Sequence, residues 1–452
     1  MLKISVSGLR GIWGKSLDHE TVINFIKAYI SFLNPKKIAI ATDTRKTRNI
    51  LKKIVESVLH SYGIKIIDLG IAPTPLLLYT VKRLKLDGGI VITSSHNPPE
   101  WNGIKLVKRE GLFLNSDEIE KVKQNFNNKI FNNFSIETIN EETASYDIIP
   151  EYLNELGKYI DFNKIKEKRL NVIVDAGNGA IISIIDKIFE RLNINYDIIH
   201  TKIGVFERNP EPIPEALIDL VKRVKENNSD IGLAYDPDAD RLAIVDKEGP
   251  IGEEYTLALS YLCLLEKGIK TDIVINYSTS TIINEIAKKY NQKVYRAKVG
   301  EINVTEEIKK RNTLLGGEGN GGVILYNFNK SRDSVVATLL LLELLAIKNK
   351  TIREIVKSFP HLFMIKEKTE IQFNEKTVDI VKNFMNNKKV NTKNILEEDG
   401  LWFELEKGFI HIRGSNTEPV VRIIGESDNF EFIKNTVVEL KDELGKKCCS
   451  NR

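Results

Sequence analysis

Short apolar runs alternate with amphipathic stretches along the first three quarters of the chain, and each run ends in a polar turn. Lys37–Ala41, Ile64–Leu69 and Ile90–Thr93 are rich in β-branched residues and have the length of buried strands. Asp18–Leu33 instead gathers its apolar residues on one helical face, with acids in its first turn. The stretch 115–143 is rich in Asn and charge and is expected to be a loose connection. The alternation of strand and helix predicts sheets covered by helices.

The order of apolar strand, polar turn and helix occurs in three places, which suggests three diverged copies of one α/β module. The strand ends read IAIATDTR, VIVDAGNG and IVINYSTS, beginning at Ile38, Val172 and Ile273. From about Lys366, strands separated by turns predominate. The predicted fold is α/β, with three related α/β domains with mixed sheets around a central cleft, plus a smaller α+β C-terminal domain. A chain of 452 residues is too long for one core, and we expect domains at 1–147, 148–250, 251–364 and 365–452.

The composition is that of a globular protein, with 42% hydrophobic and 28% charged residues. The 66 Lys and Arg residues nearly balance the 62 Asp and Glu residues, so we expect neither a nucleic-acid partner nor a membrane surface. The N-terminus lacks the apolar core of a signal peptide, and the apolar run Val335–Ile347 is shorter than the roughly 20 residues of a membrane span. Three cysteines without regular spacing favour a reducing, cytoplasmic location.

A loop of serine, histidine and proline follows the strand Ile90–Thr93. Pro98–Pro99 prevents both a helix and a continued strand, so Ser95 stands on a stiff loop at a strand end. Such a serine is well placed to act as a nucleophile or to carry a phosphate, although a simple polar turn has the same local sequence. The apolar run around Lys105 predicts a returning strand that brings this lysine back toward the serine.

A tight loop between two predicted strands carries carboxylates at alternate positions, Asp236, Asp238 and Asp240. Three converging oxygen ligands suit a hard cation such as Mg²⁺, which would also relieve the repulsion among them. A calcium-binding hand is excluded because its sixth position requires Gly and its twelfth Glu, where this chain has Arg241 and Lys247. The alternative is a solvated acidic turn.

The stretch Gly316–Gly322 contains a literal G-x-G-x-x-G pattern. A dinucleotide-binding loop must open a helix, but the next residues, Val323–Tyr326, have the pattern of a strand. A glycine-lined turn that holds Glu318 and Asn320 suits a polyol, because the backbone can approach closely while carboxylate and amide bind hydroxyl groups. A permissive hairpin turn is the alternative interpretation.

A fourth loop, Arg413–Pro419, lies between two strands, and Arg422 is on the second of them. Guanidinium groups, hydroxyls and loop amides together form a nest for a phosphate dianion. The lysine and following helix of a nucleotide-binding P-loop are missing, so a phosphate on a small molecule fits better.

These four loops follow one another in the order of the α-D-phosphohexomutases, one per domain, and the chain resembles that family along its whole length. By this resemblance Ser95 carries the phosphate, and Mg²⁺ binds to it together with Asp236, Asp238 and Asp240. Ser7–Gly11 matches the family's opening loop. The other implied site residues are Arg10, His96, Lys105 and Arg241 as catalytic groups, Glu318, Asn320 and Lys298 at the sugar, and Arg413, Ser415, Asn416, Thr417 and Arg422 at the distal phosphate.

The resemblance also implies the reaction. Ser95 would donate its phosphoryl group to a hexose monophosphate, and the other phosphate of the resulting hexose bisphosphate would return to the serine. Hexose 1-phosphate and hexose 6-phosphate are thereby interconverted, with one Mg²⁺ per chain and the bisphosphate as intermediate and primer. The expected partner is a small phosphosugar, and the protein is expected to be a monomer or a homodimer.

Some positions depart from the usual pattern of the family. Pro237 stands where Gly is usual in the metal loop, and Ser334 stands where Gly is usual after Arg332 and Asp333. In the sugar loop, Asn320 and Gly322 stand where many members have Ser and His.

The run Lys298–Glu301 has the Lys-Val-Gly form of phosphoglucosamine mutases and related archaeal-type enzymes. It favours a glucosamine phosphate substrate, whose ammonium group would lie near Glu318 or Glu301. The alternatives are a phosphoglucomutase/phosphomannomutase of broad specificity, a serine-dependent phosphate hydrolase, and a non-catalytic sugar-phosphate binding protein.

Overall fold

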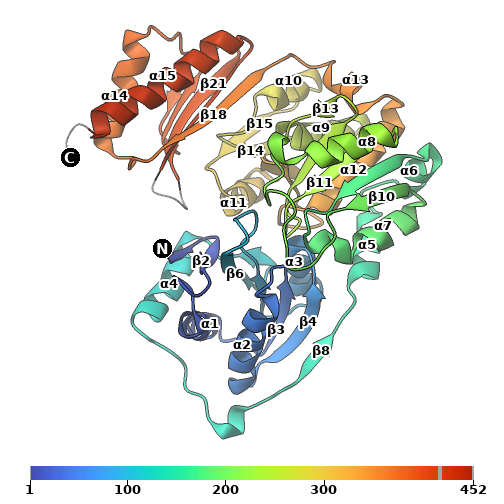
Figure 1. Cartoon of the computed structure of the whole chain (residues 1–452), viewed down its shortest axis with the longest axis vertical. Coiled ribbons are helices and arrows are strands. Elements are labelled where there is room, and N and C mark those ends of the chain that lie inside the picture. The colour runs from blue at the N-terminus through green and yellow to red at the C-terminus, as the bar shows by residue number, and fades with distance from the viewer. Residues whose placement is uncertain (1, 416–419, 450–452) are drawn as a thin grey trace.

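The computed structural model describes residues 2–415 and 420–449, and Figure 1 shows them as four units, each built on its own sheet. The first sheet has the strand order β1-β2-β6-β5-β3-β4-β8, with β7 paired to β6. Its strands are β1 (Lys3–Ser5), β2 (Gly8–Ile12), β3 (Lys37–Thr42), β4 (Lys65–Ile71), β5 (Gly88–Ile92), β6 (Trp101–Lys108), β7 (Leu112–Phe113) and β8 (Thr143–Ser145). The helices of this unit are α1 (His19–Leu33), α2 (Arg48–Ser61), α3 (Thr74–Arg83) and α4 (Ser116–Asn127).

The second and third sheets have the orders β10-β9-β11-β12-β13 and β15-β14-β16-β17. Their strands are β9 (Asn171–Asp175), β10 (Asn195–Ile199), β11 (Ile231–Tyr235), β12 (Leu242–Asp246), β13 (Gly249–Pro250), β14 (Ile273–Asn276), β15 (Val294–Ala297), β16 (Leu315–Glu318) and β17 (Gly322–Leu325). The accompanying helices are α5 (Ile149–Leu156), α6 (Phe162–Lys168), α7 (Ile185–Leu192), α8 (Ile218–Glu226), α9 (Glu254–Glu266), α10 (Ile282–Lys289), α11 (Glu301–Arg311), α12 (Ser334–Lys348) and α13 (Ile352–Val356).

The first three sheets share one arrangement of four strands. In the orders β4-β3-β5-β6, β10-β9-β11-β12 and β15-β14-β16-β17, the first two neighbouring pairs are parallel and the third pair is antiparallel. The antiparallel pair places the loop between its two strands close to the loops at the ends of the parallel strands. The predicted repetition of one α/β module, with mixed sheets, is therefore confirmed.

The C-terminal unit is smaller and fully antiparallel, with the strand order β18-β22-β21-β20-β19. Its elements are β18 (Phe363–Thr369), α14 (Glu375–Asn387), β19 (Asn394–Leu396), β20 (Leu401–Glu404), β21 (Gly408–Gly414), β22 (Val421–Ser427) and α15 (Phe430–Cys449). Figure 1 shows the unit at one end of the molecule, next to the third unit. Among the described residues, none of the helices combines the length and the apolar character that a membrane span requires.

One apolar core extends across the first three units. Tyr79 of α3, Tyr152 of α5 and Phe328 after β17 pack with ring centroids 5.1, 5.3 and 5.0 Å apart. The hydroxyl of Tyr152 donates to Asp333, at the N-terminus of α12, at 2.7 and 2.8 Å. The C-terminal unit has a separate core and meets the third unit through contacts such as the Trp402 indole, which donates to the carbonyl of Tyr277 at 3.0 Å.

The stretch 115–143 is more regular than expected, because α4 occupies its first half. Asn115 and Glu118 form a capping box, in which each side chain accepts from the other's backbone N–H. Ile119 and Val122 are buried in the core that also contains α1. The prediction of a loose connection is wrong here, since two apolar residues and a good cap suffice for a helix.

Candidate active site

A large cleft of about 1440 Å³ lies between the four units, and its walls come from all of them. The serine loop after β5, the aspartate loop between β11 and β12, the glycine loop between β16 and β17 and the end of β21 all reach it. The loops that sequence patterns selected therefore meet at one place.

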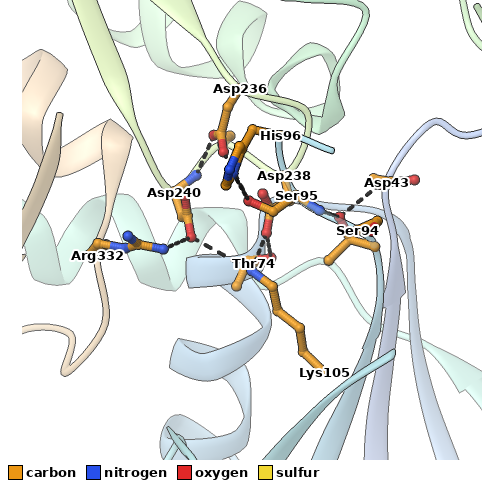
Figure 2. Close-up of polar contacts among 12 residues, drawn as sticks. Asp43, Thr74, Ser94, Ser95, His96, Lys105, Asp236, Asp238, Asp240 and Arg332 are labelled. Atoms are coloured by element: carbon orange, nitrogen blue, oxygen red, sulfur yellow. Dashed lines mark hydrogen bonds and ion pairs between the residues drawn. The ribbon is translucent and has the colours of Figure 1, made fainter. Parts of the chain in front are cut away.

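Ser95 lies in this cleft and is almost fully buried. Its hydroxyl donates to Asp236 Oδ2 at 3.3 Å and lies 3.3 Å from His96 Nδ1 (Figure 2). The neighbouring Ser94 is also buried, but its hydroxyl donates to Asn97 Oδ1 at 3.4 Å and does not line the cleft. Of the two serines, Ser95 is the one that faces the carboxylates.

Asp236, Asp238 and Asp240 are fully buried, and each offers an oxygen within 4.8 Å of the other two. The Oδ1 atoms of Asp238 and Asp240 have no hydrogen-bond partner among the described residues. Burial and the two neighbouring carboxylates hold the pKa of Asp236 well above its usual range. Buried carboxylate oxygens that accept no hydrogen bond from the described residues and repel one another fit a divalent cation with oxygen ligands, so these residues could hold a metal ion.

Pro237 is compatible with the geometry of this loop. The residue of the loop with a positive φ is Ala239, at 52°, so the position of Pro237 does not require glycine. The carbonyl of Pro237 accepts from the N–H of Ala180 at 2.7 Å, which ties the loop to the turn after β9.

Lys105 and Arg332 contact the Oδ2 atoms of Asp238 and Asp240 (Figure 2). Lys105 Nζ, on β6, lies 2.6 Å from Asp238 Oδ2 and 3.6 Å from Asp240 Oδ2. Burial acts to lower the pKa of Lys105, but these carboxylates outweigh it and raise the pKa. Arg332 donates to Asp240 Oδ2 at 2.5 Å. Burial acts to raise the pKa of Asp240, but the charges of Arg332 and Lys105 outweigh this effect, so the pKa is lowered.

Three further predicted catalytic residues lie around the serine. Arg10, on β2, donates to Asn97 Oδ1 at 2.8 Å, and burial lowers its pKa to about 10, so it keeps its charge at neutral pH. Arg241 follows the aspartate loop and donates to Glu211 at 3.1 Å. Burial and then the charge of Arg241 lower the pKa of His96 well below its usual range, which makes the imidazole neutral.

Glu318 lies at the end of β16 and is held by three donors. Its Oε1 accepts from the Asn276 amide at 2.8 Å and from Gly300 N–H at 3.0 Å, and its Oε2 accepts from Arg332 at 2.7 Å. Burial acts to raise the pKa of Glu318, but Arg332 and the Asn276 amide outweigh it and lower the pKa. Asn320 also lines the cleft, with its buried Oδ1 unpartnered among the described residues.

Arg332 joins the metal loop to the sugar loop, a role that the sequence did not indicate. One guanidinium contacts Asp240 and Glu318, and its Nε lies 3.3 Å from Glu301 Oε2. The backbone N–H of Arg332 also donates to Glu301, at 2.9 Å. The sequence gives one weak indication of this role, which is that Arg332 directly precedes Asp333, the N-cap of α12.

In the run Lys298–Glu301, only the last three residues are among those that line the cleft. Val299, Gly300 and Glu301 line the cleft, whereas the side chain of Lys298 is exposed and Lys298 is not among the lining residues. Burial raises the pKa of Glu301, and Arg332 opposes that effect.

The predicted phosphate loop presents a row of cations across three strands. Arg413 on β21 is opposite Arg422 on β22, which in turn is opposite Lys368 on β18. All three line the cleft, as does Ser415, whose N–H donates to the carbonyl of Val420 at 2.9 Å. Burial lowers the pKa of Arg413, and the charge of Arg422 adds to this effect while Asp399, 3.6 Å from Arg413 Nε, opposes it. Two adjacent guanidinium groups suit an anion bound between them. The predicted Asn416 and Thr417 lie outside the described residues.

Comparison with known proteins places the chain in a family. Residues 1–133, 150–249 and 253–363 match domains I, II and III of phosphoglucomutase/phosphomannomutase, and residues 366–443 match its C-terminal domain. A phosphoglucosamine/phosphogalactosamine mutase of Sulfurisphaera tokodaii is 33% identical over 442 residues, which cover 96% of this chain and 97% of the relative. A phosphoglucomutase/phosphomannomutase of Thermococcus kodakarensis is 32% identical over 432 residues, 94% of each chain.

The fold agrees with solved structures of the same group. A phosphoglucomutase/phosphomannomutase family protein of Burkholderia thailandensis superposes with a TM-score of 0.83, covering 100% of this chain and 99% of its own, at 24% identity. All four domain matches occur in the expected order along nearly the whole chain. The chain therefore belongs to the phosphoglucomutase/phosphomannomutase family of phosphohexomutases.

Proposed function

We propose that this protein is an isomerase that interconverts hexose 1-phosphate and hexose 6-phosphate through a phosphate carried on Ser95 and a hexose bisphosphate intermediate. The observation that carries the proposal is a cleft lined by Ser95 and by Arg413 and Arg422 of the fourth unit, with the three aspartates buried next to Ser95. A serine beside a cation site supplies the reacting end, and the arginines supply a site for the other phosphate of the sugar.

The proposed chemistry assigns the cations around Ser95 to charge stabilisation. A phosphorylated serine carries about −1.5 to −2 charges at pH 7, and Mg²⁺ held by Asp236, Asp238 and Asp240 would neutralise part of it. Lys105 has a raised pKa and keeps its proton, so it stabilises the transferring group rather than acting as a base. Arg10 has the same role from β2, the strand paired with the strand of Lys105.

His96 is proposed to move the proton at Ser95. Its Nδ1 lies 3.3 Å from Ser95 Oγ, and its lowered pKa leaves the imidazole neutral and able to accept. When Ser95 Oγ attacks phosphorus, its proton passes to His96 and from there to the sugar oxygen that leaves the phosphorus. When a sugar hydroxyl attacks the phosphoserine, its proton passes by the same route to the departing serine oxygen. Burial lowers the pKa of His96, and the nearby charge of Arg241 adds to that effect.

The proposed substrate is a glucosamine phosphate. Relatives that are 33% and 30% identical have phosphoglucosamine mutase in their names. Glu318 and Glu301 share the guanidinium of Arg332, whose charge also serves Asp240 of the metal loop, so the two carboxylates at the sugar end of the cleft have one shared cation. An ammonium group would compensate the remaining negative charge, while a neutral hydroxyl would not.

A broad glucose and mannose specificity is the second candidate. One relative is named phosphoglucomutase/phosphomannomutase, and in this chain Glu318 already has a cation partner, which reduces its need for a substrate ammonium. The two candidates differ in kcat/KM for glucosamine, glucose and mannose 6-phosphates. Glu301→Gln should lower the glucosamine value more than the glucose value, with the exposed Glu306→Gln on the same helix as control. Equal losses for both sugars would remove the electrostatic argument.

The assignment of the phosphate is tested by mass spectrometry. Peptide mapping should find one phosphate on Ser95, and Ser95→Ala should abolish turnover while Ser94→Ala retains it. Phosphate on Ser94, or an active Ser95→Ala variant, would refute the assignment. For the metal, Asp238→Asn should weaken Mg²⁺ binding in calorimetry, with the exposed Asp379→Asn as control.

We also propose domain boundaries at 1–147, 148–250, 251–364 and 365–452, supported by the family matches, each of which falls within one of these ranges. The protein is proposed to act in the cytoplasm as a monomer or a homodimer, with a small phosphosugar as partner. Light scattering coupled to size-exclusion chromatography tests the oligomeric state.

A further inference from the structure

The backbone of Ser95 has an unusual conformation for a residue with a side chain. Its φ is 51°, in the left-handed region that favours glycine. Strained conformations of this kind persist only where the surrounding structure holds them, and they cluster at functional sites. The conformation of Ser95 therefore needs a specific cause in its surroundings.

Both peptide groups of Ser95 are fixed by a closed ring of hydrogen bonds. Its N–H donates to Thr93 Oγ1 at 2.9 Å, and its carbonyl accepts from Arg45 at 2.7 Å. Thr93 Oγ1 in turn donates to Asp43 Oδ2 at 2.7 Å, and Arg45 Nε donates to the same oxygen at 3.1 Å. All four residues are almost completely buried, so water does not compete for these bonds.

The guanidinium of Arg45 uses all five of its N–H groups. Its acceptors are Asp43 Oδ2 and the carbonyl oxygens of Ser95, Asn97, Pro98 and Trp101. A lysine has only three donors on one nitrogen and could not reproduce this fork. The ring of Phe206, from the second unit, lies 5.1 Å from the guanidinium.

Because all its N–H groups already have acceptors, Arg45 differs from the cations that face the substrate. Its charge is paired with Asp43, and no N–H remains for a phosphate oxygen. In Figure 2, Asp43 lies on the side of Ser95 that faces away from Asp236 and Asp240. The ring therefore acts on the backbone of the serine and not on the reacting atoms.

We propose that Asp43, Arg45 and Thr93 are positioning residues that hold Ser95 in the left-handed conformation, so that its Oγ points at Asp236. The inference rests on the proposed role of Ser95 as phosphate carrier. Each return of the phosphate requires the serine oxygen at the same place, and an unrestrained serine would relax to a negative φ, which turns its side chain away.

The test uses Thr93→Val and Arg45→Lys in the full-length protein. Thr93→Val keeps the volume and removes the oxygen that links Ser95 to Asp43. Its control is Thr80→Val, on a buried threonine whose hydroxyl donates to the Leu76 carbonyl of its own helix. We expect both ring variants to lower kcat about 10- to 100-fold with KM within about twofold of the parent. Thr80→Val should leave kcat unchanged.

A crystal structure of Thr93→Val supplies a readout that does not depend on the substrate. We expect the φ of Ser95 to leave the left-handed region and the distance from its Oγ to Asp236 to increase beyond 3.3 Å. An unchanged Ser95 backbone, or a kcat equal to that of the parent, would overturn the inference. If the parent protein had no mutase activity, the proposed function would be wrong. The φ of Ser95 in the Thr93→Val crystal structure would still show whether the hydrogen-bonded ring holds the serine backbone.

Discussion

Replacing Arg332 by Met tests whether one guanidinium holds the metal loop and the sugar loop together. Methionine retains much of the length of the side chain but has no charge and no donor. Asp240, Glu318 and Glu301 would lose a partner that now lies 2.5, 2.7 and 3.3 Å away. All three carboxylates are buried or half-buried, so water could replace the lost partner only in part.

The expected cost is large because the carboxylates remain after the cation is removed. Breaking a buried ion pair by truncating one partner costs about 3–5 kcal/mol. Arg332 lies in the third unit, which packs against the second, and for a body of that size 1 kcal/mol corresponds to roughly 2–4 °C in the melting temperature. We therefore expect Arg332→Met to lower the melting temperature by about 6–20 °C in a chelator. Mg²⁺ should restore part of this loss, because a second cation then compensates Asp240.

The assay is thermal melting of parent and variant in EDTA and in saturating Mg²⁺. Arg311→Met is the control, because Arg311 forms a half-exposed pair with Glu307 on α11, at 2.7 Å, that is worth about 0–1 kcal/mol. The reasoning would be refuted if Arg332→Met lost no more stability than Arg311→Met. It would also be refuted if Mg²⁺ stabilised the variant no more than the parent.

Three further predictions concern the interdomain contact, pH and substrate affinity. Tyr152→Phe removes the donor to buried Asp333 and should lower the free energy of unfolding by about 1.5–3 kcal/mol, measured by urea titration; an unchanged midpoint would contradict this. The hydrogen bond to Asp175 raises the pKa of His200, so its stabilisation is present below about pH 6.5 and is lost as pH rises through the higher folded pKa. The melting temperature of the parent should thus exceed that of His200→Gln more at about pH 6 than at about pH 9, and a constant difference would argue against it. Arg413→Ala should raise KM for the hexose phosphate about 10- to 150-fold without changing Mg²⁺ affinity, and a normal KM would exclude a role in phosphate binding.

Features encoded within a few residues of one another could be predicted from the sequence. The strands were visible as β-branched runs, and the polar residues at their ends selected Ser95 and the three aspartates. The structure brings these residues together because the loops at corresponding strand ends of the repeated module face the same cleft. The short helix α4 was missed because only two of its residues are buried.

The residues that the sequence did not indicate act over long distances along the chain. Arg332 and Asp240 are 92 residues apart, and Arg45 is 50 residues from the carbonyl of Ser95 that it holds. Such contacts depend on how separate parts of the chain pack together. The local pattern of hydrophobic and polar residues does not indicate them. Lys298 illustrates the converse, since its neighbours line the cleft and its own side chain is exposed.

The aromatic contact among Tyr79, Tyr152 and Phe328 has a consequence for synthesis on the ribosome. Lys82 on α3 also donates to the carbonyl of Phe328, and these two residues are 246 positions apart. At roughly 5–20 residues per second, about 12–50 s pass between the synthesis of Lys82 and the synthesis of Phe328. During that time the face of Tyr79 that stacks on Phe328 stays open to other chains. We therefore expect nascent chains that stop before Phe328 to be bound by chaperones.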